Sequence, residues 1–130
     1  TPLGRQEWER YEALLEIEWA ALNATREGAP LSEAFTALKR AYAGCRYPEA
    51  WRHHHQGGPC GYYGRDFFAT PSEERRASDR SAYAWNPSLP GLKVEDTVLL
   101  VDGRLEVITV DEEWPAVRFD ELKRPDLLAL

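Results

Sequence analysis

The feature that most constrains the fold is a change in the spacing of apolar residues near position 44. Before it, large apolar side chains recur every three or four residues, which is the spacing of one face of an α-helix. The first such stripe runs over residues 6–26 and the second over residues 31–43. After it, helical spacing is lost, and short runs rich in valine, leucine and aromatic residues predict β-strands. Helices followed by strands indicate an α+β domain.

The two predicted helices have recognisable ends and apolar faces. Gly28 and Pro30 end the first helix, and Gly44 stands where a left-handed residue often terminates a helix. The apolar stripes consist of Trp8, Tyr11, Leu15, Trp19 and Leu22 in the first helix and of Leu31, Phe35, Leu38 and Tyr42 in the second. We expect both helices to pack through these side chains on one face of a sheet.

Three segments of the second half predict antiparallel strands: residues 82–85, 94–101 and 104–110. The dipeptide Asp102-Gly103 between the last two is a strong signal for a two-residue hairpin turn. Residues 72–81 are charged and are expected to form a solvated loop or a short turn of helix. Pro115 and Pro125 argue against a long regular element in the tail. Because we find no linker and no repeat, we expect residues 1–130 to form a single domain.

Charge and composition exclude several classes of partner. The net charge of -6, without a basic stripe, disfavours nucleic acid. No apolar run approaches the roughly 20 residues that cross a bilayer, so no membrane partner is expected. Cys45 and Cys60 are too few for a disulfide framework, which favours reduced thiols in a cytoplasmic protein. Since the chain begins at Thr1 and lacks methionine, we expect it to be a piece of a longer protein.

Three consecutive histidines, His53 to His55, precede Gln56 and two glycines. Imidazoles are common ligands of transition metals, and glycines let a backbone approach a ligand closely. Adjacent side chains on a strand point to opposite faces, so at most two of the three histidines could serve one site. The alternative is that one imidazole is buried and hydrogen-bonded while the others are solvated.

An acidic pair, Glu95 and Asp96, interrupts an otherwise apolar strand. Alternation along a strand puts the two carboxylates on opposite faces. A carboxylate that points into a core needs a cation, a metal or several hydrogen-bond donors to offset its lost hydration. The alternative is an edge strand on which both acids are solvated.

In their order along the chain, these features resemble the carboxy-terminal half of the pita-bread metallopeptidase domain of creatinase, prolidase and the Xaa-Pro aminopeptidases. Two helices lead to the segment His54-His55-Gln56-Gly57-Gly58, then to Asn86-Pro87, and then to a Glu-Asp strand that ends in an Asp-Gly turn. The segment Tyr62-Tyr63-Gly64-Arg65-Asp66 is similar to a Tyr-Tyr-Gly-Arg-Glu segment of creatinase-like members. The resemblance covers residues 5–110 and implies two helices packed on an antiparallel sheet.

The resemblance also implies part of a site for two divalent cations, such as manganese, cobalt or zinc. Glu95 matches a glutamate ligand, and Asn86 stands in place of a second one. His54 matches the histidine ligand when Gly64-Arg65-Asp66 is the anchor, whereas the His-x-x-Gly spacing alone also allows His55. By the same resemblance, Tyr62, Tyr63 and Arg65 are expected to contact a substrate. Two further aspartate ligands of the family belong to the other half of the domain.

The chain departs from the family pattern at three positions: Asn86, Gly61 and Lys93. The neutral amide of Asn86 binds a hard cation more weakly than a carboxylate does. Gly61 stands about where many members have a second histidine, and Lys93 replaces an arginine that orients the glutamate. We therefore expect the metal site of this chain to be incomplete or absent, and the isolated chain to be inactive.

Three kinds of function follow from the resemblance. The first is a fragment of a metallopeptidase-family protein whose parent hydrolyses or binds short peptides or small molecules, as an Xaa-Pro aminopeptidase or dipeptidase does. The alternative is a non-catalytic pita-bread domain that binds peptides or small amino compounds. A third is an oligomerisation half-domain, because a lone half exposes a sheet face that a copy of itself or the missing amino-terminal half would cover.

Overall fold

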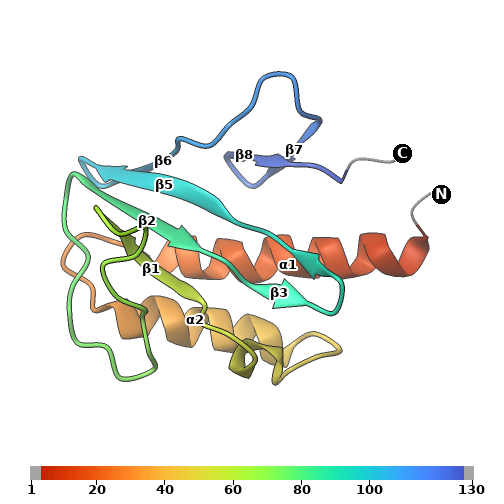
Figure 1. Cartoon of the computed structure of the whole chain (residues 1–130), viewed down its shortest axis with the longest axis horizontal. Helices are drawn as coiled ribbons and strands as arrows, with labels where there is room; N and C mark the ends of the chain where they lie inside the picture. The colour runs from red at the N-terminus through yellow and green to blue at the C-terminus, as the bar shows by residue number, and fades with distance from the viewer. Residues whose placement is uncertain (1–3, 128–130) are drawn as a thin grey trace.

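Two helices and a four-stranded antiparallel sheet form the framework of the computed structural model, which describes residues 4–127. Helices α1 (Arg5–Ala24) and α2 (Leu31–Ala43) lie side by side on one face of the sheet (Figure 1). The order of the sheet is β1-β2-β5-β6, with strands β1 (Gly57–Cys60), β2 (Ser81–Trp85), β5 (Asp96–Val101) and β6 (Arg104–Val107). The α+β fold and the two helices predicted from the sequence are thereby confirmed.

The remaining elements are short and lie between or after the main strands. A single 3-10 turn, η1 (Ala50–Arg52), precedes β1. A two-stranded ribbon of β3 (Ser88–Leu89) and β4 (Leu92–Lys93) connects β2 to β5. A second ribbon, of β7 (Ala116–Phe119) and β8 (Leu122–Pro125), follows β6. The sequence did not predict this second ribbon, because strands of four residues are too short to show a period.

The predicted hairpin at Asp102-Gly103 joins β5 to β6. Both turn residues have positive φ, 49° and 72°, as the central positions of a type I′ turn require. The strand expected at 94–101 instead begins at Asp96. Its ladder with β2 is interrupted because Pro87 has no N–H to donate. The strand expected at 104–110 ends at Val107.

The predicted left-handed cap at Gly44 is wrong. Gly44 ends α2 with φ -82° and ψ -8°, which is right-handed helical geometry. Its N–H still donates to carbonyls of the last helical turn, those of Ala41 and Tyr42, so the turn closes without a residue of positive φ.

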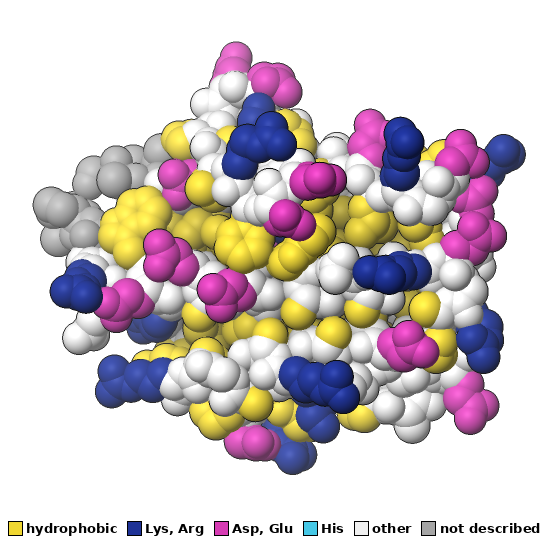
Figure 2. Space-filling view, turned by 180° about the vertical axis from the view of Figure 1, so that it is seen from behind, with side chains coloured by type: hydrophobic (Ala, Val, Ile, Leu, Met, Phe, Trp, Pro, Cys, Tyr) yellow, Lys and Arg dark blue, Asp and Glu magenta, His cyan; other side chains and the backbone are white. Residues whose placement is uncertain are grey.

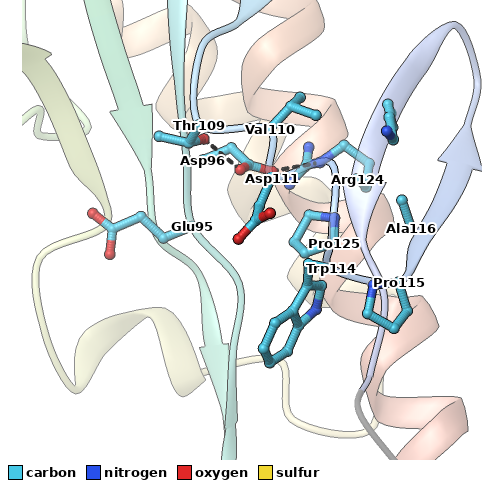
Figure 3. Close-up of a pocket in the computed structure, with 11 residues that line it drawn as sticks. Glu95, Asp96, Thr109, Val110, Asp111, Trp114, Pro115, Ala116, Arg124 and Pro125 are labelled. Atoms are coloured by element: carbon cyan, nitrogen blue, oxygen red, sulfur yellow. Dashed lines mark hydrogen bonds and ion pairs between the residues drawn. The ribbon is translucent and has the colours of Figure 1, made fainter.

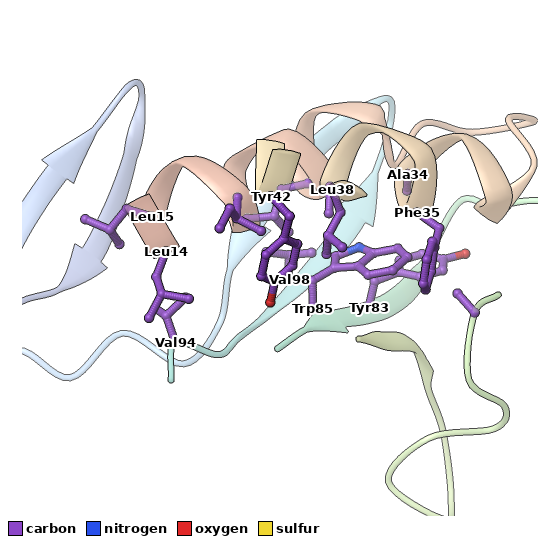
Figure 4. Packing of buried hydrophobic residues seen from close by; sticks show 14 of the residues in the cluster. Leu14, Leu15, Ala34, Phe35, Leu38, Tyr42, Tyr83, Trp85, Val94 and Val98 are labelled. Carbon is purple, nitrogen blue, oxygen red and sulfur yellow. The ribbon is translucent and has the colours of Figure 1, made fainter. Parts of the chain in front are cut away.

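The core lies between the helices and the inner face of the sheet (Figure 4). Trp85 of β2 is fully buried, and its indole N–H donates to Thr25 Oγ1 at 2.9 Å. Phe35 and Leu38 of α2 pack toward Trp85 and Tyr83 (Figure 4). Burying such a side chain stabilises a fold by about 1.5–3 kcal/mol, so these contacts fix the helices over the sheet.

Charged side chains of both signs are distributed over the face shown in Figure 2, with apolar side chains between them. Of the three histidines, all of which the structure describes, none is visible on this face. Among residues 4–127, neither α-helix is long and apolar enough to cross a membrane.

Candidate functional site

The residues that the sequence singled out come together at one end of the sheet. The strand pairing continues for one residue past the end of β2, where Asn86 donates its N–H to the Gln56 carbonyl at 3.0 Å. On the other side, Val94 donates to the Pro87 carbonyl at 3.3 Å. Asn86 therefore lies between Gln56 and Glu95, each on an adjacent segment of the chain. The three histidines directly precede Gln56 in the sequence.

Two glycines at the start of β1 allow this close approach of the backbones. Gly57 and Gly58 have φ values of 120° and 155°. A Cβ on Gly57 would lie 2.1 Å from the carbonyl oxygen of Ala84, and one on Gly58 would lie 2.4 Å from that of Phe67. Side chains at these positions would push β1 off its neighbours, so the glycines fix where the histidine segment runs.

Gln56 anchors the histidine segment to α2, a role that the sequence analysis did not assign. Its side chain is fully buried, and its Oε1 accepts a hydrogen bond from the Tyr42 hydroxyl at 3.0 Å. Its Nε2 donates to the carbonyls of Trp51, at 3.1 Å, and His54, at 3.0 Å. The Tyr42 oxygen also accepts the N–H of Ser88 at 2.9 Å. Burial raises the pKa of Tyr42 to about 12, so the hydroxyl stays protonated.

The histidines have different surroundings. His53 is exposed, whereas His54 is half-buried and uses both ring nitrogens. Its Nε2 lies 2.5 Å from Ser88 Oγ, and its Nδ1 contacts the carbonyl oxygen of His55. These contacts set the orientation of the His54 ring.

His55 is exposed, and its ring stacks on Phe68 with centroids 3.8 Å apart and planes at 13°. Partial burial lowers the pKa of His55, and the charges of His54, Arg65 and Lys93 lower it further, whereas Glu95 opposes them. His55 therefore lies within electrostatic reach of the charged groups around Glu95.

Glu95 is held by two cations. Its Oε1 lies 2.5 Å from Arg65 Nη2, and its Oε2 lies 3.1 Å from Lys93 Nζ. Partial burial alone would raise the pKa of Glu95, but the hydrogen bonds from Arg65 and Lys93 outweigh it and lower the pKa. Glu95 is thus a carboxylate with both oxygens engaged.

Asp96 lies on the opposite face of β5, as strand alternation predicts, and Figure 3 shows the two carboxylates pointing apart. The Asp96 carboxylate accepts hydrogen bonds from Thr109 Oγ1 at 2.6 Å and Arg124 Nε at 2.9 Å, beside a cavity of about 250 Å³. Glu18 of α1 forms an ion pair with the same guanidinium. The inward carboxylate therefore has the cation that its burial demands, and Arg124 in the tail carried no sequence signal for this role.

Two buried polar atoms near Glu95 lack a hydrogen-bond partner among the described residues: Asn86 Oδ1 and Arg65 Nε. Asn86 is 2% exposed, and the Arg65 side chain is 15% exposed. An unpaired buried polar group is costly, so such atoms are candidates for contact with a ligand.

Arg65 is also one of the three residues predicted to contact a substrate. The other two, Tyr62 and Tyr63, are 93% and 85% exposed at the tip of the same loop, with their rings edge to face 5.0 Å apart. Their role in substrate binding stays a prediction.

A hollow of about 350 Å³ opens beside the histidines. Its walls are mainly aromatic and apolar, and its lining includes Phe35, Trp51, His54, His55, Phe68 and Pro71. His55 lines this hollow, whereas Glu95 lines the separate cavity beside Asp96.

The side chains present do not fit a pair of divalent cations. Within residues 4–127, no three or more histidine, cysteine, aspartate or glutamate side chains converge as a metal cluster would require. Glu95 is already neutralised by Arg65 and Lys93, and Asn86 is uncharged. A metal ion at Glu95 would meet two positive charges close by, which repel it.

Solved structures with a similar fold are a dipeptidase from Pyrococcus horikoshii OT3 and prolidases from Thermococcus sibiricus and Pyrococcus furiosus. Their TM-scores are 0.72, 0.72 and 0.70, at sequence identities of 21%, 22% and 20%. The chain shares their fold. The matched region covers 85%, 87% and 85% of this chain but only 32%, 32% and 34% of theirs, so the chain spans about a third of their length.

No protein-family model and no curated protein sequence matches the chain. The three similar structures confirm the resemblance to pita-bread proteins as a likeness of fold. The roles assigned above to His54, His55, Asn86 and Glu95 as metal ligands stay predictions.

The position of His55 next to Glu95 can be tested by titration. We expect the Glu95→Gln variant to lower the pKa of His55 further, because the carboxylate that opposes the neighbouring cations is removed. Imidazole chemical shifts recorded by NMR between pH 4 and pH 9 report this pKa. His53, which is exposed, serves as the internal control. An unchanged His55 pKa would show that the two side chains do not share a site.

Proposed function

We propose that this chain is part of a peptidase-like domain and binds short peptides at the end of the sheet around Glu95. The observation that carries the proposal is the strand pairing that sets Asn86 beside Gln56 and Glu95, next to an aromatic hollow that His54 and His55 line. Support also comes from the fold, which resembles that of a dipeptidase and two prolidases. Ligand sites of this kind combine apolar walls with a few polar groups that orient the ligand.

The chain offers both parts of such a recognition surface. Trp51 and Phe68 give the hollow flat apolar walls, which suit an aliphatic side chain or a proline ring. Asn86 Oδ1 is an unpaired acceptor, and it would take a peptide N–H once the segments that bury it move aside on binding. His55, which lines the hollow and stacks on Phe68, would set the ligand's direction.

We propose binding without hydrolysis for this chain, because its side chains do not fit the metal pair that the family resemblance implies. A second candidate is a metal-dependent peptidase, which ligands from outside this chain would complete. It is favoured by the retention of His54 and Glu95 at positions that match family ligands. Because the chain matches only about a third of the length of the similar structures, we propose that residues 1–130 form one half of a domain. The other half would cover the outer face of the sheet.

Peptide binding can be mapped by NMR on the ¹⁵N-labelled chain, with the dipeptide Ala-Pro and the tripeptide Ala-Pro-Ala as ligands. We expect saturable shift changes at His55, Asn86 and Lys93, and none at the exposed residue Arg118 of β7. Shift changes confined to other elements, or none at all, would refute a peptide site at this position.

The same titration, repeated on an Asn86 variant, tests whether Asn86 contributes to the affinity for the peptide. Removing a hydrogen bond to a ligand costs about 1–1.5 kcal/mol, so we expect Asn86→Ala to weaken the binding of Ala-Pro-Ala by about tenfold. Asn23→Ala, an equivalent change at an exposed position of α1, is the matched control and should bind as the wild type does. Equal affinity of both variants would remove Asn86 from the site.

A further inference from the structure

We propose that the cavity beside Asp96 is a second ligand site, which binds a small organic ammonium ion between the carboxylate of Asp111 and the ring of Trp114. The cavity has a volume of about 250 Å³ and is separate from the aromatic hollow next to the histidines. Pockets for drug-sized ligands measure about 300–1,000 Å³, so this cavity suits a ligand with few atoms. Such a site is independent of the peptide site proposed above.

Trp114 presents an oriented aromatic ring to this cavity. Its indole N–H donates to the carbonyl of Asp126 at 2.9 Å, which fixes the ring, yet 43% of the residue stays exposed. Pro115 and Pro125 add apolar walls beside the ring (Figure 3). A cation over the face of a tryptophan ring is attracted by the negative charge of that face. The alkyl part of an organic cation would bury apolar surface against the prolines.

Asp111 supplies a carboxylate oxygen that is open to a ligand. Its Oδ1 accepts a hydrogen bond from the N–H of Glu113 at 2.9 Å, and no described residue donates to its Oδ2. Figure 3 shows the Asp111 carboxylate between the Asp96–Arg124 pair and the Trp114 ring. A primary ammonium group offers only donors, and a carboxylate offers only acceptors. The two groups therefore match.

The two cations that line the cavity are already paired with carboxylates other than Asp111. On the inner side, the Arg124 side chain is 1% exposed and pairs with both Glu18 and Asp96. At the rim, Lys123 pairs with Glu112 at 3.1 Å. These five side chains carry three negative and two positive charges, which leaves one negative charge in excess.

The excess stays negative when the other nearby charges are counted. Asp111 adds a second uncompensated negative charge. Glu95 also lines the cavity, but its side chain points away from Asp96 (Figure 3) and pairs with Arg65 and Lys93. That group carries one positive charge more than it balances, and the nearby Asp66 offsets it. The surroundings of the cavity therefore attract a cation and repel an anion.

Two ligands of similar size, n-butylammonium and 1-butanol, test whether the cavity recognises the charge. Each is titrated into the ¹⁵N-labelled 130-residue chain at about 0.15 M ionic strength, which screens distant charges. The indole N–H signal of Trp114 is followed by NMR. Because the ion gains both the ring and the carboxylate, we expect it to bind at least about fivefold more tightly than the alcohol.

Two variants with matched controls assign the binding to these side chains, and the backbone N–H of Ala116, which lines the cavity, reports it in each. Asp111→Asn keeps an acceptor for the Glu113 N–H but loses the charge, and it should weaken n-butylammonium by about threefold. Glu113→Gln removes the same charge from an exposed residue outside the lining and should bind as the wild type does. Trp114→Leu should weaken the ion by about fivefold. Trp8→Leu, at a tryptophan that is 36% exposed, should not.

A free amine and a lysine side chain carry the same ammonium group, so the peptide acetyl-Gly-Lys-Gly-amide is titrated as well. Tighter binding of this peptide than of n-butylammonium would assign the site to lysine side chains, and weaker binding would assign it to free amines. Equal affinities for n-butylammonium and 1-butanol would overturn the site. So would an unmoved Trp114 signal, or equal losses of affinity in Asp111→Asn and Glu113→Gln.

Discussion

Replacing Arg124 with methionine is expected to lower the free energy of unfolding by about 3–5 kcal/mol, the usual cost of removing one partner from a buried ion pair. The Arg124 side chain is 1% exposed and lies between Glu18 of α1 and Asp96 of β5. Burial lowers its pKa only to about 10, so the guanidinium is charged at neutral pH. Methionine fills much of the volume but leaves two buried carboxylates without a cation.

Urea unfolding followed by circular dichroism at pH 7 measures this effect. The matched control is Arg118→Met, at an exposed position of the same hairpin, which should change the free energy of unfolding by no more than about 0.5 kcal/mol. If the two variants were equally stable, Arg124 would not be what attaches the β7–β8 hairpin to the core.

Replacing Gly57 with alanine is expected to destabilise the fold by about 2–6 kcal/mol, because two penalties of about 1–3 kcal/mol each combine. The φ of 120° is unfavourable for any residue with a side chain. In addition, the new Cβ would lie 2.1 Å from the carbonyl oxygen of Ala84, which is backbone and cannot rotate away. Relief of this contact requires β1 to move from β2, which also displaces His54 and His55.

Gly44→Ala is the matched control for this prediction. Gly44 has φ -82°, and a Cβ there would lie 3.5 Å from the Ala41 carbonyl oxygen, an ordinary contact. We expect the free energy of unfolding of this variant to lie within about 1 kcal/mol of the wild-type value. Urea unfolding of both variants, with peptide binding as a second readout, checks the pair. A Gly57→Ala protein as stable as Gly44→Ala would contradict the close approach of β1 and β2.

The parts of the fold that local patterns encode could be predicted from the sequence. Apolar stripes indicated both helices, and Asp102-Gly103 indicated the β5–β6 hairpin, since each signal lies within a few consecutive residues. The Glu18–Arg124–Asp96 cluster could not be predicted in this way. Its members lie 78 and 28 residues apart in the sequence, and a charged residue next to a proline in an irregular tail has no pattern that indicates burial.

The candidate site could be predicted in part for the same reason. Family resemblance singled out His54, Asn86 and Glu95. The structure pairs Asn86 with Gln56, two residues after His54, and sets it opposite Glu95, while the ligand roles of all three stay predictions. No local pattern indicated that Arg65 and Lys93 both contact Glu95. Arg65 lies 30 residues before it and reaches it only because the loop after β1 folds back along the strand.

The central claim is that this site works without a metal pair, and titration with metal tests it most directly. The full chain is titrated with Mn²⁺, Co²⁺ or Zn²⁺ by calorimetry and then assayed for hydrolysis of Ala-Pro, with Glu95→Ala alongside. One imidazole, one carboxylate and one amide provide too little negative charge for two divalent cations. We therefore expect no saturable binding of two ions per chain and no hydrolysis. Metal-dependent hydrolysis by the wild type that disappears in Glu95→Ala would contradict the account.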